Sequence, residues 1–527
     1  MKRRSFIKAA PAVVLPALVG GYSVKAYGAS PLFSALAGAD ADNDHVLVII
    51  QLDGGNDGLN TVIPLDQYST LSTLRSNVLI DQNKVLPLNG TIATGLHPSM
   101  TGLQQLYNDD KVRIVQGVGY PNPNYSHFRA TDIWTSASDS NQTLTTGWIG
   151  RYLNYEFPNY PAGYPNTNAP HPLAVQIGSF ISPIFQGPTA NYAMAISDPV
   201  NFYNLVNGIQ DPAPATPAGD ELTYVRLIAN QANQYATVVK DAANTVTSQG
   251  AYPSNNSLAD QLKIVARLIG GGLKTRVYMV RLGGFDTHAT QVVPGTTETG
   301  THADLLGKLS SAIKAFQDDI QGLGVADRVV GLTFSEFGRR IISNFSSGTD
   351  HGAAAPCILF GNKVIPGILG ANPSISTSTG VNDNLPMQYD FRSIYTSLLQ
   401  DWFCVPKAVV DASITLQNFQ LLPLVNPSGC YPASVHDLNS KAGIQLIKSY
   451  PNPFVEKTKI EFTTAGGHTL IEVYDGAGKH IKTLIDQDLV VGNYVVDFRS
   501  ENALPGLYYA RLQNGVMSQV VAMSLVR

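Results

Sequence analysis

The chain has 527 residues and a formal net charge of −4, with 44% hydrophobic and 14% charged residues. This length is enough for a large core and further domains, and the near-neutral charge leaves no basic footprint for nucleic acid. The sequence therefore argues for a globular protein without a nucleic-acid partner. Cys357, Cys404 and Cys430 have no CxxC spacing, which argues against a zinc knuckle. Cys404 and Cys430 can pair in an oxidising compartment, or all three can be free thiols.

The first 30 residues have the layout of an export signal. A basic patch at residues 2–8 contains Arg3-Arg4 followed by Phe6, and residues 9–21 form an apolar run that is short for a membrane span. The paired arginines resemble a twin-arginine export signal. An uncleaved anchor is the alternative, but no charge cluster of the stop-transfer kind follows. No other stretch approaches about 18 apolar residues, so we expect no membrane span in the mature protein.

From residue 46 onward, apolar strands alternate with amphipathic helices. Strands that end in glycine-rich turns are predicted at residues 46–50, 112–119, 276–282, 329–334 and 357–360. Spacing of three and four residues predicts helices at residues 222–243, 257–268 and 303–323, after an irregular insertion at 155–220. Alternation of this kind predicts a mostly parallel α/β sheet flanked by helices over residues 44–420.

The last part of the chain follows a different pattern. Residues 421–445 are polar and contain proline, which predicts a linker. Beyond it, apolar residues alternate with polar ones between turn residues, which predicts strands at 459–462, 469–474, 494–498, 507–512 and 518–525. The sequence therefore predicts a small β-sandwich over residues 446–527.

Polar side chains that can bind metal or catalyse follow four of the predicted strands. They are Asp53 after the first, Ser126 and His127 after the second, Asp286 and His288 after the third, and Glu336 after the fourth, with Asp350 and His351 a short loop beyond. Taken singly, an Asp in a turn can simply cap the backbone, and Glu336 can pair with Arg339 or Arg340 at the surface. Taken together, they are expected at one edge of the sheet, where ligands bind in open α/β folds. Carboxylates with imidazoles suit zinc or manganese better than calcium.

Six motifs then carry a resemblance. They are Gln51 to Thr61, Ser126-His127-Phe128, Thr146-Gly147-Trp148, Gly284 to His288, Ser335 to Arg340 and Gly348 to Gly352. In this order, over roughly residues 44–420, they resemble a bacterial family of exported, sulfatase-like proteins that has no established activity. By fold, that family falls within the alkaline phosphatase superfamily, so the resemblance implies a sheet of alkaline phosphatase or sulfatase type.

The plan of that superfamily implies roles for residues of this chain. Asp53, Asp286, His288 and His351 match metal ligands, and Glu336 stands where relatives carry an Asp-His pair. Ser126 occupies roughly the place of the nucleophile. Two departures matter: Phe337 replaces a ligand histidine, and no Cys-x-Pro-x-Arg motif is present, which argues against formylglycine chemistry.

The tail has a resemblance of its own. Tyr450-Pro451-Asn452-Pro453-Phe454, residues 473–478 and residues 506–509 resemble the type A C-terminal sorting domain of the type IX secretion system of Bacteroidetes. This implies that the type IX machinery handles residues 446–527 and that the protein is secreted or lies at the cell surface. An ordinary accessory β-sandwich is the alternative. A twin-arginine start is unusual beside this tail, because that route usually takes substrates of the general Sec pathway.

Two functions follow as hypotheses. The first is an exported metal-dependent hydrolase of phosphate or sulfate esters, acting on a small or polymeric anionic substrate. In it, Asp53, Asp286, His288, Glu336 and His351 hold a divalent ion such as zinc or manganese, Ser126 or a water attacks, and Arg339 steadies the anion. The second is a non-catalytic surface protein that binds an anionic glycan or polymer with the same fold.

Overall fold

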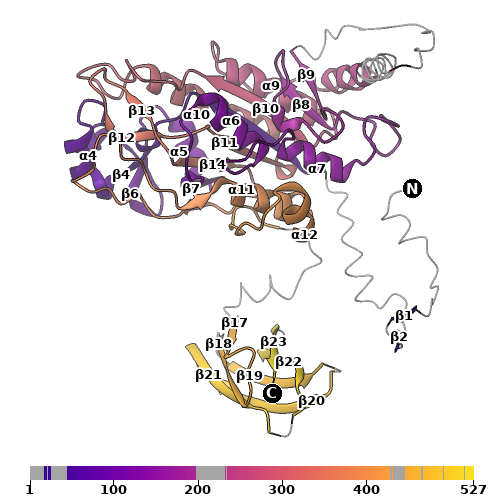
Figure 1. Cartoon of the computed structure of the whole chain (residues 1–527). Helices are drawn as coiled ribbons and strands as arrows, with labels where there is room; N and C mark the ends of the chain where they lie inside the picture. Colours follow the sequence, from indigo (N-terminus) through magenta and orange to yellow (C-terminus); the bar gives the residue numbers. More distant parts are fainter. Residues whose placement is uncertain are drawn as a thin grey trace. The chain divides into compact units, whose positions relative to one another are not determined.

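The computed structural model describes residues 17–19, 22–24, 44–197, 216, 232, 234–427, 430, 445–464, 467–476, 478–490, 492–501, 503–514 and 517–526. The chain divides into two compact units, one of residues Asp42–Pro427 and one of Met1–Ala41 with Ser428–Arg527 (Figure 1). Much of the predicted export signal, of the predicted linker and of the helix predicted at 222–243 lies outside the described residues, as does the end of the insertion. Within the predicted signal, β1 (Ala17–Val19) pairs antiparallel with β2 (Tyr22–Val24). Of the helix predicted at 222–243, the described residues 234–245 are helical.

One large sheet organises the unit Asp42–Pro427. Among the described residues its order is β15–β7–β14–β11–β3–β10–β8–β9, with β16 beside β7. Its strands are β3 (Val46–Asp53), β7 (Val112–Gly119), β8 (Ala174–Ile177), β9 (Ala193–Ile196), β10 (Val277–Gly283), β11 (Val329–Phe334), β14 (Ala355–Phe360), β15 (Gly367–Leu369) and β16 (Tyr389–Asp390). All strands run parallel except β14, which is antiparallel to both β11 and β7. The predicted fold class, a mostly parallel α/β sheet flanked by helices, is confirmed.

The central strand β3 is apolar from Val46 to Ile50, because helices pack on both of its faces. Val48 and Ile50 pack in one core with α5 (Thr101–Asn108), α9 (Ser257–Gly270) and α10 (Thr301–Gly322). Leu47 and Ile49 pack in the other core with α6 (His127–Ser136), α7 (Trp148–Glu156) and α11 (Phe391–Ser397). Each such side chain contributes about 1.5–3 kcal/mol on full burial, so β3 is held firmly from both sides.

Shorter elements complete this unit. The helical ones are α3 (Gly58–Thr61), α4 (Tyr68–Leu74), α12 (Lys407–Val409), the 3₁₀ turns η1 (Leu65–Gln67), η2 (Gln82–Lys84), η3 (Pro183–Phe185) and η4 (Ala326–Arg328), and the π-helical turns η5 (Leu398–Trp402) and η6 (Val410–Ile414). Two small antiparallel sheets are β4 (Val62–Pro64) with β6 (Thr91–Leu96) and β5 (Leu86–Leu88), and β12 (Arg339–Ser343) with β13 (Thr349–His351). No helix among the described residues combines the length and apolar character that a membrane span needs. Cys404 and Cys430 are disulfide-bonded, and Cys357 is a buried free thiol.

The C-terminal residues form two antiparallel sheets. One contains β17 (Gln445–Tyr450), β18 (Lys457–Thr464) and β21 (Gly492–Arg499), and the other β20 (His480–Leu489), β19 (Gly467–Asp475), β22 (Gly506–Asn514) and β23 (Met517–Leu525). Ile460 and Phe498 of the first sheet share a core with Val473 and Met523 of the second, as in a sandwich. The structure adds β17 and β20 to the predicted strands. β20 is exposed along most of its length, which explains its weak apolar pattern.

Candidate metal centre and adjoining cavity

The parallel strands bring the candidate residues to one edge of the large sheet. Because β3, β7, β10 and β11 run in the same direction, their carboxyl ends lie at that edge. Asp53 is the last residue of β3, Asp286 follows β10, and Glu336 follows β11. His127 is the first residue of α6, which comes after β7.

A turn of two glycines lets these strand ends approach each other. Gly54 has a φ of +122°, and a Cβ on it would overlap the backbone nitrogen of Asp286. Gly55 has a φ of +84°, and a Cβ on it would overlap the ring of Phe337. Only glycine combines these φ values with such close packing. The turn therefore allows the loop that carries Asp286 to lie directly against the end of β3.

Asn56 and Asp57, the two polar residues after the glycines, hold the turn in place through buried hydrogen bonds. The buried Asp57 carboxylate accepts hydrogen bonds from Arg75 and from Gln291 Nε2, the latter at 2.6 Å. Burial tends to raise the pKa of Asp57, but Arg75, His302 and Gln291 together outweigh it and hold the pKa below its usual value. Asn56 Oδ1 lies 3.0 Å from His302 Nε2 in the same buried network. Asn56 and Asp57 thus have structural partners in the interior.

Asp286 lies at the centre of the candidate site. Its Oδ1 is 2.8 Å from His288 Nδ1, 3.2 Å from His351 Nε2 and 2.7 Å from Arg339 Nη2, and its Oδ2 is 3.5 Å from His127 Nε2. Burial tends to raise the pKa of Asp286, but the hydrogen bonds from Arg339 and His351 and the nearby positive charges together outweigh it and lower the pKa to about 2. The carboxyl group is therefore ionised at neutral pH.

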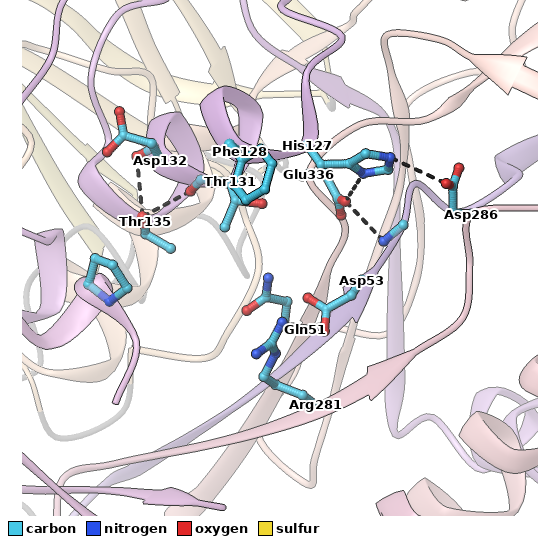
Figure 2. Close-up of a pocket in the computed structure, with 12 residues that line it drawn as sticks. Gln51, Asp53, His127, Phe128, Thr131, Asp132, Thr135, Arg281, Asp286 and Glu336 are labelled. Atoms are coloured by element: carbon cyan, nitrogen blue, oxygen red, sulfur yellow. Dashed lines mark hydrogen bonds and ion pairs between the residues drawn. The ribbon is translucent and has the colours of Figure 1, made fainter. Parts of the chain in front are cut away.

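Two of the imidazoles are oriented by acceptors behind them. His127 Nδ1 lies 2.8 Å from Glu336 Oε1, and His351 Nδ1 lies 2.8 Å from the backbone oxygen of Tyr125. Since both partners accept, each ring carries its proton on Nδ1 and directs Nε2 towards Asp286. Figure 2 shows His127 held in this way between Glu336 and Asp286. The ligand atoms of His127, Asp286 and His351 all lie within 4.8 Å of one another.

This donor set fits a divalent metal ion. A neutral His351 has one N–H, already placed on Nδ1, so its Nε2 lone pair faces a carboxylate oxygen at 3.2 Å. A second proton would bridge the two acceptors, but burial lowers the pKa of His351 and favours the neutral ring. A metal cation would bridge His351 Nε2 and the Asp286 carboxylate without protonating the ring. Imidazole nitrogens with outer acceptors and one carboxylate are ligands that zinc and manganese accept.

Two predicted residues have mainly protein partners, and a third lies away from the cavity. Glu336 is 2% exposed and accepts from Gly54 N at 2.9 Å as well as contacting His127. Arg339 is 1% exposed and donates to Asp286 and to the backbone oxygens of Gly54, Gly55, Phe285 and Thr349. Ser126 is the exposed residue before α6, and it is not among the residues that line the cavity beside the site.

A cavity of about 500 Å³ adjoins the cluster. His127, Asp286 and Glu336 line it on one side, and Gln51, Asp53 and Arg281 line it on another (Figure 2). Asp53 Oδ2 lies 2.6 Å from Arg281 Nη2, so Asp53 shares the cavity but is paired with a cation from β10. Burial raises the pKa of Asp53 despite this hydrogen bond.

The sequence assigned no role to two groups of this site. His127 appeared among the candidates at the end of the second strand, in the Ser-His-Phe motif, but was not assigned as a ligand. The backbone oxygen of Tyr125 gives no sequence signal, because any residue supplies one. The signal that could have found His127 is its place at the start of a helix at the same sheet edge as Asp286.

Comparisons with known protein families match one segment in each part of the chain. Residues 193–411 match the family "Protein of unknown function (DUF1501)", and residues 448–524 match the family "Secretion system C-terminal sorting domain". No curated protein matches the chain.

Solved structures that resemble the chain include a protein of the alkaline phosphatase superfamily from Vibrio parahaemolyticus, at 10% identity, 84% coverage of this chain, 82% of that chain and a TM-score of 0.32. Another is the provisionally named sulfatase yidJ from Bacteroides fragilis, at 8% identity, 87% and 90% coverage and a TM-score of 0.30. A third is an alkaline phosphatase from the Antarctic bacterium TAB5, at 12% identity, 61% and 93% coverage and a TM-score of 0.23. These TM-scores are too low for residues to be matched one by one.

Recognition of the two sequence families is confirmed by these matches. The sorting domain implies handling by the type IX secretion machinery, so the predicted secreted or cell-surface location is confirmed as well. The twin-arginine signal stays a prediction. The chain thus joins a DUF1501 segment to a C-terminal secretion sorting domain.

Proposed function

We propose that the protein is an exported metal-dependent hydrolase of phosphate or sulfate esters. The observation that carries the proposal is the convergence of the His127 and His351 Nε2 atoms on the ionised Asp286, with ligand atoms of all three residues within 4.8 Å of one another. A divalent ion bound by these three residues supplies Lewis acidity towards an ester oxygen. The cavity of about 500 Å³ beside them has room for a small ester or for one unit of a polymer.

The proposal keeps two of the predicted ligands, Asp286 and His351, and adds His127. Glu336 becomes a positioning residue, because it is buried behind His127 and fixes the proton on that ring. Arg339 has the same kind of role, since its donors are directed to Asp286 and to backbone oxygens. His288 Nδ1 lies 2.8 Å from Asp286, where an N–H would help to hold the carboxylate.

The remaining chemistry falls to groups that face the cavity. Hydrolysis adds water to the phosphorus or sulfur atom, breaks the ester bond and requires a proton for the departing oxygen. Asp53 faces the cavity, and burial raises its pKa, so it is suited to hold that proton and donate it. Water is the preferred nucleophile over Ser126, because Ser126 does not line the cavity.

The test measures bound metal and turnover in the same preparations. We expect about one divalent ion for each full-length chain by plasma mass spectrometry, and turnover of an aryl sulfate or of a bis-aryl phosphate. Asp286→Asn keeps the shape of the side chain but removes its charge, so bound metal and turnover should both fall at least 10-fold. Asp132→Asn is the matched control, because Asp132 lines the same cavity but pairs with Arg129. Absence of metal from the wild-type protein, with full activity in Asp286→Asn, would sink the proposal.

The second candidate is a non-catalytic protein that binds an anionic glycan or polymer. It is favoured by the exposed ring of Phe128 at the cavity, which offers contact area without any reactive group. Retention of a sulfated glycan, without turnover of any ester in the metal-loaded protein, would select this candidate over the hydrolase.

A further inference from the structure

We propose that the cavity contains a second subsite, beside the His127–Asp286–His351 cluster, that binds an uncharged sugar ring. Gln51, Arg281 and Asp53 form its polar floor, and Phe128 forms its apolar side. This inference deepens the proposed function by naming a carbohydrate ester as the substrate class. It rests on that function for turnover, but binding of the sugar itself needs no metal.

Gln51 is the observation that points to a ligand. It lies on β3 between Ile50 and Leu52, is 3% exposed and lines the cavity. Its side-chain amide has no hydrogen-bond partner among the described residues, although it carries two donors and one acceptor. The amide atoms are not among the fully buried unpartnered ones, so they open onto the cavity. An amide at this place in an otherwise apolar strand is available to a ligand. A ligand with hydroxyl groups would satisfy it.

Arg281 and Asp53 extend the same polar surface. Arg281 is in register with Gln51 across the parallel pair of β10 and β3, and Asp53 follows Gln51 by two residues, so all three side chains lie on one face. Figure 2 shows them gathered on one side of the cavity. Arg281 Nη2 pairs with Asp53, but the buried Arg281 Nε has no hydrogen-bond partner. A guanidinium, a carboxyl group and an amide on one face of the sheet offer donors and acceptors to neighbouring hydroxyls.

Aromatic rings border this polar floor. Phe128 is 91% exposed, follows the ligand His127 directly and lines the cavity. Phe180 is half exposed and stacks on the Arg281 guanidinium, with 4.6 Å between that group and the ring centre. A pyranose has one face of C–H groups and an edge of hydroxyls, so it matches a flat ring beside planar polar groups.

Other ligands match this surface less well. An aryl group could lie against Phe128 but would leave the Gln51 amide unpaired. A second anionic group is disfavoured, because even without Asp53 the cavity is lined by three carboxylates and one guanidinium: Asp132, Asp286, Glu336 and Arg281. A neutral polyhydroxylated ring satisfies the amide and adds no charge to the cavity.

The test is saturation-transfer NMR on the full chain with three kinds of probe. They are neutral methyl pyranosides, glycerol as an open-chain polyol, and benzyl alcohol as an aryl group. We expect saturation of the ring protons of at least one pyranoside, with or without prior treatment with a chelator. Gln51→Leu, which keeps the side-chain volume, should weaken binding at least 10-fold, and Phe128→Ala about 5-fold. Phe345→Ala is the matched control, since Phe345 is fully exposed and does not line the cavity.

The outcomes separate this inference from the proposed hydrolase. Binding of benzyl alcohol without binding of any pyranoside would overturn the sugar subsite, and so would equal pyranoside affinity in Gln51→Leu and in the wild type. Either result leaves the metal measurement on Asp286→Asn unaffected. If Gln51→Leu fails to fold, Phe128→Ala decides, because that exposed side chain contributes little to the core. Pyranoside binding by a protein that holds no metal as isolated, together with full activity in Asp286→Asn, would support the subsite and refute the hydrolase.

Discussion

Two buried histidines beside the glycine turn make the stability of the α/β unit sensitive to acid. Burial lowers the pKa of His302 to about 4 and that of His97 to about 3. Both values lie below the usual 6.5, so the unfolded chain takes up protons first as the pH falls. The stability that the two neutral histidines contribute to the folded state is therefore fully present above pH 6.5 and is lost as the pH falls to 4 and below. We expect a loss on the order of a few kcal/mol in the free energy of unfolding between pH 7 and pH 4.5, measured with urea.

His302→Gln provides the control for this prediction. The variant should be less stable at pH 7 because it loses packing, but its stability should change less between pH 7 and pH 4.5. Asp57 does not contribute to the change in stability between pH 7 and pH 4.5, because its pKa lies below its usual value and it takes up a proton only at lower pH. An unchanged pH dependence in His302→Gln would contradict the assignment to this residue.

At the residue scale, the sequence placed several candidate residues close together but not their internal contacts. Asp286 and His288 were expected at the sheet edge because they follow a parallel strand, and His351 because it lies a short loop beyond another. Their role as ligands stays a prediction. The partner of Asp53 was not found, because Arg281 belongs to another strand and only the register of β3 with β10 brings them together. The orientation of His351 depends on a backbone oxygen, which no side-chain pattern predicts.

Among the structural elements, the glycine turn after β3 offers the sharpest test of packing. Gly55 and Gly90 have nearly equal φ values, +84° and +82°, but a Cβ on Gly55 would overlap the Phe337 ring, whereas a Cβ on Gly90 meets nothing within 4 Å. Gly90→Ala should therefore cost only the backbone strain, about 1–2 kcal/mol. Gly55→Ala should cost at least about 2 kcal/mol more in the free energy of unfolding, measured by chemical denaturation.

A double variant separates the overlap from other causes. Phe337→Ala removes the ring that meets the new methyl group, so Gly55→Ala should cost less in that background than in the wild type. Additive effects of the two substitutions would show that Phe337 is not the obstacle.

The elements themselves were predicted to different degrees for physical reasons. Strands β3, β7 and β11 were found closely, because burial on both faces requires an uninterrupted apolar run. The antiparallel direction of β14 was not predicted, since a buried strand looks the same in either direction. β20 was not found because its exposed side chains leave little apolar alternation.

For the whole molecule, the hydrophobic cores predict that the two units unfold separately. The two large cores of the α/β unit contain residues from Val46 to Val425, and the cores of the sandwich contain residues from Phe454 to Leu525. Because the two units share no core residue among the described ones, we expect two calorimetric transitions for the full chain. A chain that ends at residue 443 retains the disulfide-bonded Cys430 and should keep the transition of the α/β unit within about 2 °C.

The same truncation should abolish secretion, although it leaves the folding of the α/β unit unchanged. Residues 448–524 match the sorting domain, so a chain that ends at residue 443 should remain inside the producing cell while its α/β unit stays folded. Fractionation of the native host shows whether the truncated protein is retained, and the metal measurement on the retained protein shows whether its candidate site is intact. A shift of more than about 5 °C in the remaining transition would mean that the sandwich stabilises the α/β unit, which the separate cores argue against. Retention with unchanged metal content would assign export to one unit and the candidate site to the other.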